Sequence, residues 1–129
     1  MGTISDAMRS DFVAVAPEDT LGEVAQKMVE AKTGAVAVID FGRLVGILTE
    51  RDMLKAMAGR VLTSDARARE WMTGDPITAE PDLALDKAQG IMLSSGFRHL
   101  PVVEGGRVLG IVSLRRVAAA MAQIPLDQT

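Results

Sequence analysis

The segment "GRLVGILTERD", residues 42–52, returns 64 residues later as "GRVLGIVSLRR", residues 106–116. The same shift aligns residues 8–57 with residues 72–121 without a gap, and the pairs that are not identical are mostly conservative. A gapless match of this length indicates two copies of one structural unit. A unit of about fifty residues has a marginal core on its own. The two copies are therefore expected to pack against each other as one pseudo-twofold-symmetric domain.

Each copy shows the same order of local patterns. In the first copy, "FVAV" predicts a strand over 12–15 that Pro17 ends, and Leu21, Val24 and Met28 predict an amphipathic helix. Thr20 and Glu23 are spaced as a capping box for that helix. Two apolar runs joined at Gly42 predict a hairpin, and "RDMLKAM" begins another helix. In the second copy the pattern predicts strands over 77–79, 99–103 and 108–114, a helix over 84–95, and a helix that ends near 122.

The predicted fold class is therefore α/β (α+β), with the order β-α-β-β-α repeated once. The predicted boundaries are 4–60 for the first repeat, 61–70 for a linker and 71–123 for the second repeat. The polar segment around the linker contains Ser64 and Asp65, which are placed to cap a short linking helix.

Composition excludes several functional classes. The chain has no cysteine and one histidine, His99, so we expect no disulfide, no cysteine chemistry and no metal site. The net charge of −3 and the aromatic content of 3% disfavour nucleic-acid binding. The first residues lack the apolar core of a signal peptide, and no apolar run is long enough to span a membrane. These features predict a cytoplasmic protein.

Three segments resemble a pair of CBS domains, the cystathionine-β-synthase-type repeats that form a Bateman module. They are "RHLPVVEGGRVLGIVS", its weaker twin "GAVAVIDFGRLVGILTERD", and "WMTGDPITAEPD". The resemblance covers residues 4–122 and is closest to stand-alone bacterial or archaeal members. It implies regulatory binding of an adenosyl ligand in a cleft between the repeats: AMP, ADP or ATP first, S-adenosylmethionine or NAD less so. It also implies a homodimer.

Thr49 and Asp52 have two compatible interpretations. At the start of a helix, the hydroxyl can cap a backbone N–H, and the acid is stabilised by the helix dipole. The same position is also suited to anion and ribose binding. By resemblance to the family, Asp52 would hold the ribose of the ligand and Thr49 would contact its phosphate.

In the second repeat, Ser113 keeps the hydroxyl, but Arg116 replaces the acid. Arg115 and Arg116 form either a solvated helix face or an electropositive wall for phosphate. Arg98 is as consistent with the surface as with a site, and His99 with a core or edge position. The resemblance makes Arg98, His99 and Arg115 the candidate phosphate clamp.

The remaining candidates form an adenine slot. By resemblance it lies at Val13 and at the strand that holds Ala35 and Ala37, whose small side chains leave room; ordinary packing explains these alanines equally well. Because Arg116 cannot accept from ribose hydroxyls, we expect one competent adenosyl site per chain, with the second cleft empty, weakened or altered.

The sequence thus predicts a regulatory module rather than an enzyme, since no nucleophile elbow, catalytic triad or phosphate loop is evident. It would signal through the conformation of its homodimer to a downstream protein that the sequence does not identify. The alternative is a dimerisation or interaction scaffold with no small-molecule site.

Overall fold

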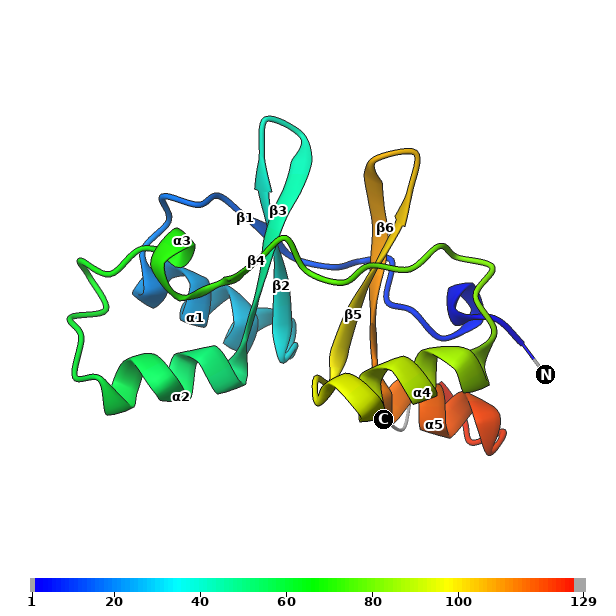
Figure 1. Ribbon diagram of the computed structural model, residues 1–129. Helices are drawn as coiled ribbons and strands as arrows, with labels where there is room; N and C mark the ends of the chain where they lie inside the picture. The colour runs from blue at the N-terminus through cyan, green and yellow to red at the C-terminus, as the bar shows by residue number, and fades with distance from the viewer. Residues whose placement is uncertain (1, 127–129) are drawn as a thin grey trace. The chain divides into compact units, whose positions relative to one another are not determined.

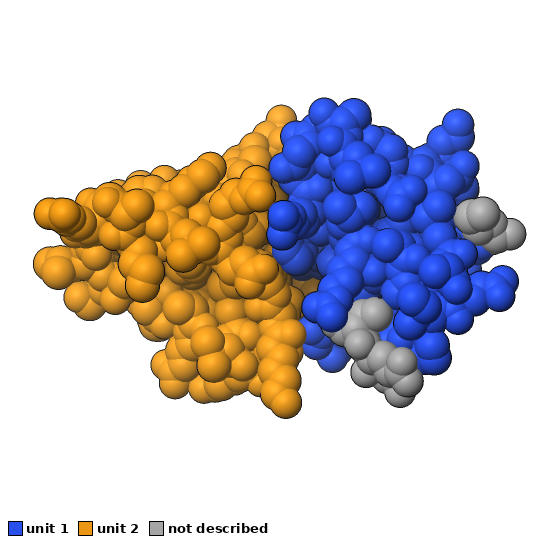
Figure 2. Space-filling model, turned by 90° about the horizontal axis from the view of Figure 1, so that it is seen from below, with its two compact units in different colours: residues 1–11, 77–129 blue, residues 12–76 orange. Residues whose placement is uncertain are grey.

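The computed structural model describes residues 2–126. The chain divides into two compact units, which Figure 2 colours separately. Unit 2 is continuous and comprises residues 12–76. Unit 1 comprises residues 2–11 together with residues 77–126. The first repeat therefore forms most of unit 2, and the second repeat forms most of unit 1.

Unit 2 is a four-stranded sheet with helices packed against it (Figure 1). The strand order is β1-β2-β3-β4, with β1 parallel to β2 and the other neighbours antiparallel. Its elements are β1 (Ala14–Val15), α1 (Leu21–Ala31), β2 (Ala35–Asp40), β3 (Arg43–Thr49), α2 (Glu50–Ala58), α3 (Ala68–Trp71) and β4 (Thr73–Gly74).

Unit 1 has the same plan with shorter flanking strands. The hairpin of β5 and β6 is its sheet, and the positions of β1 and β4 are taken by single bridges, Ala79 to Val102 and Arg9 to Ile111. Its elements are the 3-10 helix η1 (Ile4–Asp6), α4 (Leu85–Ser95), β5 (His99–Glu104), β6 (Arg107–Ser113) and α5 (Leu114–Met121). The β-α-β-β-α repeat and the mixed α+β class predicted from the sequence are confirmed.

Each unit is completed by the segment that opens the other repeat. Residues 2–11, the N-terminal strap, pair with unit 1 through two hydrogen bonds between Arg9 and Ile111 and through the Ile4 amide, which donates to Leu83 at 2.9 Å. Residues 68–76, the central strap, place β4 beside β3 of unit 2. Because the straps are exchanged, the compact units are offset from the sequence repeats.

The two cores use matched positions of the repeat. In unit 2 the core contains Leu21, Met28, Val36, Val38 and Leu48, and in unit 1 it contains the matched Leu85, Met92, Leu100, Val102 and Val112. All ten side chains are buried. Burial of this kind, at roughly 1.5–3 kcal/mol for each large aliphatic side chain, is the main stabilising contribution to each unit.

The helix start at Leu21 is confirmed in detail. The Thr20 amide donates to Glu23 Oε1 at 3.1 Å, and the Glu23 amide donates to the Thr20 hydroxyl at 3.2 Å. This is the reciprocal capping box that the spacing predicts.

The predicted cap of the linking helix is wrong. Helix α3 begins at Ala68 with Arg67 as its N-cap, and the Arg67 amide donates to Glu70 at 2.7 Å. Neither Ser64 nor Asp65 caps it. The reason is tertiary: the Ala68 amide donates to the Asp19 carbonyl at 2.8 Å, which fixes where the helix starts.

The short strands are also shorter than predicted. β1 includes only Ala14 and Val15, because the parallel pairing to β2 has only these two residues in register. The strand expected over 77–79 is reduced to the bridge at Ala79. Every helix among residues 2–126 is too short or too polar to cross a lipid bilayer.

Candidate functional site

The junction between β3 and α2 holds the first two candidate residues, Thr49 and Asp52. The Thr49 amide and hydroxyl both donate to Asp52 Oδ2, at 2.8 Å and 3.1 Å, and the Asp52 amide approaches the Thr49 hydroxyl oxygen at 3.4 Å. Both residues are half-buried. The capping interpretation of this motif is therefore correct as a statement about local structure.

Capping uses only one oxygen of the Asp52 carboxylate. Oδ2 accepts both bonds from Thr49, and within residues 2–126 no donor is directed at Oδ1. A carboxylate oxygen has two lone pairs and can accept from neighbouring hydroxyls. The cap thus orients the carboxylate and leaves one oxygen able to accept from a ligand.

The matched junction of β6 and α5 is built differently. The Arg116 amide donates to the Ser113 hydroxyl at 3.1 Å, so the hydroxyl cap predicted for Ser113 is confirmed. The Arg116 side chain turns to the N-terminal strap, where its Nε donates to the Ala7 carbonyl oxygen at 2.6 Å. This contact spans 109 positions in the sequence, and no local pattern indicated it.

The strap places two more charges near Arg116. Arg9 and Asp11 form an ion pair with 3.3 Å between Nε and Oδ1. The hydrogen bond and charge of Arg9 lower the pKa of Asp11, and Arg116 adds a smaller electrostatic contribution in the same direction. Arg116 is therefore a structural link between α5 and the strap, a role that the sequence did not reveal.

The candidate phosphate residues gather at one end of unit 1. His99 opens β5 opposite Ser113 in the register of the hairpin, and the Leu114 amide donates to the Arg98 carbonyl at 2.8 Å. Arg98 and Arg115 are exposed, and His99 is half-buried. Two cations and an imidazole therefore lie around the start of α5, where free helix amides also favour an anion.

The candidate adenine residues gather at the corresponding end of unit 2. The Ala37 amide donates to the Val13 carbonyl at 2.9 Å, and Ala35 pairs with Thr49 across β2 and β3. Ala35 and Ala37 are buried, and Val13 is half-buried. The structure thus brings Val13, Ala35, Ala37, Thr49 and Asp52 together within unit 2, and Arg98, His99, Ser113, Arg115 and Arg116 together within unit 1.

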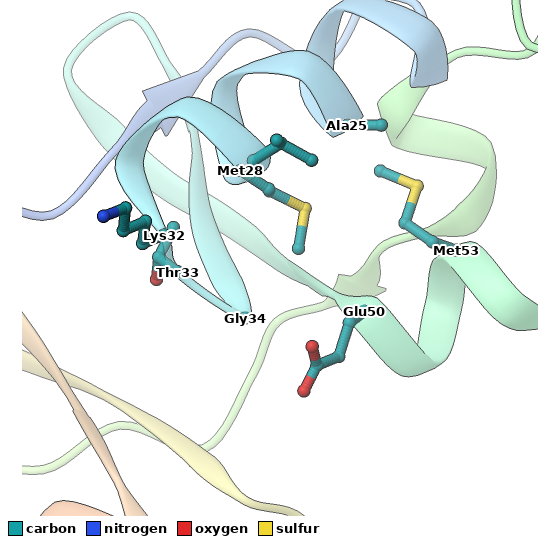
Figure 3. Close-up of a pocket in the computed structure, with 8 residues that line it drawn as sticks. Ala25, Met28, Lys32, Thr33, Gly34, Glu50 and Met53 are labelled. Carbon is teal, nitrogen blue, oxygen red and sulfur yellow. The ribbon is translucent and has the colours of Figure 1, made fainter. Parts of the chain in front are cut away.

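A pocket that the sequence analysis missed lies between α1 and α2 of unit 2 (Figure 3). Its volume is about 450 Å³. The side chains of Ala25, Met28 and Met53 face its interior, and Lys32 and Glu50 lie at its rim. Residues 2–126 contain no cluster of three or more acidic or histidine side chains able to hold a metal ion.

Comparisons with known proteins agree with this architecture. The family model of the CBS domain matches the chain twice, at residues 4–59 and 68–123. An uncharacterised 17.7 kDa protein of Acidianus ambivalens is 37% identical over 123 residues, which cover 94% of this chain and 74% of that protein.

Solved structures give the same result. The CBS-domain-containing protein ATU1752 of Agrobacterium tumefaciens is 35% identical, with a TM-score of 0.85 over 92% of this chain and 98% of that one. The CBS domain pair of protein MJ0100, solved in complex with 5-methylthioadenosine and S-adenosyl-L-methionine, is 25% identical, with a TM-score of 0.85. The match with MJ0100 covers 95% of this chain and 98% of that one.

Proposed function

The chain belongs to the CBS-domain family, with two copies of the domain, and from that premise we propose that it is a regulatory module that binds an adenosyl ligand. The observation that carries the proposal is the Asp52 carboxylate, which is oriented by Thr49 through Oδ2 while Oδ1 accepts no bond within residues 2–126. Support for the adenosyl class comes from the similar CBS pair of MJ0100, which binds two adenosyl compounds.

In this proposal, unit 2 recognises the nucleoside. Asp52 Oδ1 accepts from a ribose hydroxyl, and the adenine lies against Val13, Ala35 and Ala37. Both alanine side chains are small and buried, and in this proposal the backbone groups near β1 supply polar partners for the edge of the base. The Thr49 hydroxyl, which donates to Asp52 Oδ2 in this structure, would turn to donate to the first phosphate or to the group that replaces it.

Unit 1 offers positive charge for a phosphate. Arg98 and Arg115 are exposed cations beside His99 at the start of α5. A phosphate there would also be stabilised by the helix amides and the Ser113 hydroxyl. AMP, ADP and ATP fit this division best, because they combine a ribose diol with a phosphate. S-adenosylmethionine and NAD are the less favoured ligands.

Arg116 limits the site to one per chain. Its guanidinium is bonded to Ala7, and it cannot accept from a ribose diol in the way that Asp52 can. We therefore propose one nucleotide for each chain rather than two. The ligand would favour one conformation of the chain by the difference in its affinities for the alternatives. In a homodimer, a partner protein would respond to that change in conformation.

The test is isothermal titration of the full chain with AMP, ADP, ATP, NAD and S-adenosylmethionine. Asp52→Asn is the key variant. Its side-chain oxygen can still accept from Thr49, but its NH2 group is a donor and cannot accept from a ribose hydroxyl in place of Oδ1. Its affinity for the best ligand should fall by at least tenfold. Glu23→Gln is the matched control, because it alters the equivalent capping carboxylate of α1.

The proposal is wrong if none of the five compounds binds, or if Asp52→Asn binds as tightly as the unmodified chain. A melting temperature that is unchanged by all five compounds would instead favour the scaffold alternative, in which the CBS pair only holds proteins together.

A further inference from the structure

The α1–α2 pocket of unit 2 has an apolar part and a polar edge (Figure 3). The apolar part is formed by Ala25, Met28, Val29 and Met53. Met28 is buried and Val29 is 77% exposed, so apolar surface continues from the floor of the pocket to solvent. The volume of about 450 Å³ lies within the range of roughly 300–1,000 Å³ that is typical of small-molecule sites. The pocket therefore suits a small ligand with an apolar end.

The polar edge lies where α1 ends and α2 begins. Figure 3 shows its residues along one side of the pocket: Lys32, Thr33, Gly34 and Glu50. The Glu50 amide donates to the Gly34 carbonyl oxygen at 3.0 Å, which joins the two ends. A Cβ at Gly34 would lie 3.0 Å from Glu50 Oε1, so the glycine leaves room for the carboxylate beside the chain. A base and an acid, both exposed, therefore border the same side of the pocket.

Lys32 has a backbone conformation that favours glycine. It follows the last residue of α1 with φ of 53° and ψ of 48°, in the left-handed region. The matched residue of the second repeat is Gly96, with φ of 78°, and glycine adopts this conformation at no steric cost. A residue with a side chain is strained there, and strained residues are frequent at ligand sites. The turn after α1 therefore does not by itself call for a lysine.

The fold of the repeat does not explain the two rim charges. At the positions that match Lys32 and Glu50, the second repeat has Gly96 and Leu114. Helix α4 still ends just before Gly96, and α5 still begins at Leu114. Asp52 already supplies negative charge to the first turn of α2, where it stabilises the helix dipole. The pair of charges therefore has a role other than forming these elements.

The two charges discriminate between small ligands with an apolar end. A ligand with only a carboxylate would be attracted by Lys32 and repelled by Glu50, and a ligand with only an amine would meet the reverse. An α-amino acid carries an ammonium group and a carboxylate on one carbon, so each rim charge has an opposite partner. Its side chain would then reach the methionines, whose flexible thioethers adapt to apolar groups of different shapes.

We propose that the α1–α2 pocket of unit 2 binds an apolar α-amino acid in its zwitterionic form. Lys32 contacts the α-carboxylate, Glu50 contacts the α-ammonium group, and the ligand side chain packs against Met28 and Met53. Leucine and methionine have the apolar, flexible side chains that fit this surface. The site does not include Asp52, so it goes beyond adenosyl binding and does not depend on it.

Isothermal titration of the full chain with L-leucine and L-methionine, from about 10 µM to 10 mM, tests the class of ligand. Three compounds are the controls: isocaproate lacks the ammonium group of leucine, isoamylamine lacks its carboxylate, and glycine lacks its side chain. Leucine or methionine should bind at least tenfold more tightly than each control. The proposal is overturned if neither amino acid binds, or if isocaproate or isoamylamine binds as tightly as leucine.

Variants of the two rim charges test their separate roles. Glu50→Gln should reduce the preference for leucine over isocaproate, because the ammonium group has lost its partner. Lys32→Gln should reduce the preference for leucine over isoamylamine, because the carboxylate has lost its partner. Lys27→Gln and Glu30→Gln are the matched controls, since both side chains are exposed on α1 and neither lines the pocket. Unchanged preferences in the two rim variants would contradict the assigned contacts.

The apolar part is tested by the position of the bound ligand. Leucine should shift the nuclear magnetic resonances of isotope-labelled methyl groups at Met28 and Met53, and Ala25→Leu should abolish binding by filling the interior. Shifts at other methionines with none at these two would place the ligand outside the pocket and overturn the proposal. If the melting temperature shows that Ala25→Leu does not fold, the methyl shifts and the rim variants still decide the outcome.

Asp52→Asn separates this site from the adenosyl site. Leucine should bind this variant as tightly as it binds the unmodified chain, and this expectation holds even if no adenosyl compound binds. A loss of leucine binding in a folded Asp52→Asn chain would show that the amino acid occupies the other site, which would contradict the proposal.

Discussion

The Nε of Arg116 donates a 2.6 Å hydrogen bond to the carbonyl oxygen of Ala7. Asp52 is the residue of the first repeat that matches Arg116. In the first repeat the acid bonds back to Thr49 and stabilises the start of its own helix. In the second repeat the base reaches outward and holds the N-terminal strap. A carboxylate at position 116 would meet the carbonyl of Ala7 as a second acceptor. The change from acid to base therefore has a structural cause, independent of any ligand.

Removal of the Arg116 side chain should loosen the strap. Arg116→Ala leaves the carbonyl of the buried Ala7 without its donor, and we expect a loss of about 1–2 kcal/mol in the free energy of unfolding. Hydrogen exchange should rise at the strap amides of Ile4 and Arg9. Arg115→Ala is the control, since that side chain is exposed on the same helical turn and should change stability by less than about 0.5 kcal/mol. Equal effects of both substitutions in urea unfolding would contradict the assignment.

The Thr49 hydroxyl should be replaceable by serine but not by alanine. Thr49→Ala removes the side chain that accepts from the Asp52 amide, and loss of such a cap costs about 1 kcal/mol. Thr49→Ser should lie within about 0.5 kcal/mol of the unmodified chain, because Ser113 performs this role at the start of α5. Thermal unfolding without ligand measures both. A serine variant as unstable as the alanine variant would show that the threonine methyl matters more than the cap.

Two glycines should respond to alanine in opposite ways. A Cβ at Gly110 would lie 2.6 Å from the Arg9 carbonyl oxygen, so Gly110→Ala must displace the strap and should cost about 1–3 kcal/mol. Gly90 lies inside α4, where a methyl group would have open space around it, and Gly90→Ala should add about 0.5–1 kcal/mol of stability. Urea midpoints of the two variants should therefore fall on either side of the parent value. A destabilised Gly90→Ala would contradict the open surroundings of that position.

Acid should weaken the α1 cap. Hydrogen bonds from the Thr20 amide and hydroxyl lower the pKa of Glu23 below its ordinary value of 4.5. The unfolded chain therefore binds a proton more readily than the folded one, so stability rises with pH through this range and is lost as the pH falls below about 4.5. Glu23→Gln removes this contribution. The loss of urea midpoint between pH 6 and pH 3.5 should be smaller in the variant, and an identical loss would exclude Glu23 as a contributor.

The sequence predicted the parts of the fold that depend on local or repeated patterns. Apolar spacing located α1, the hairpins and α4, and the Thr20–Glu23 spacing predicted a correct cap. The positions that it missed depend on tertiary contacts. The start of α3 is set by the bond from Ala68 to Asp19, and the reach of Arg116 to Ala7 has no local signature.

The candidate site also divides into residues that a local pattern groups and residues that only tertiary packing explains. Residues at one strand-to-helix junction, such as Thr49 and Asp52, could be grouped from the motif alone, because β3 passes directly into α2. The α1–α2 pocket could have been inferred by comparing the repeats position by position, since Thr33 and Glu50 replace Phe97 and Leu114. That comparison needs the knowledge that the latter two side chains are packed, which only the structure supplies.

The exchanged straps also set an order in which the chain can fold as it leaves the ribosome. Unit 2 is a continuous segment, and all its strands are available once Pro76 has emerged. Unit 1 is split: its strap is made at the start of the first repeat, but β6, the strand that the strap bonds to, follows only near the end of the second repeat. Residues 2–11 must therefore wait through the synthesis of roughly a hundred residues, which at 5–20 residues per second takes about 5–20 seconds. A segment that is made at the start of the first repeat is thus among the last to be fixed in place.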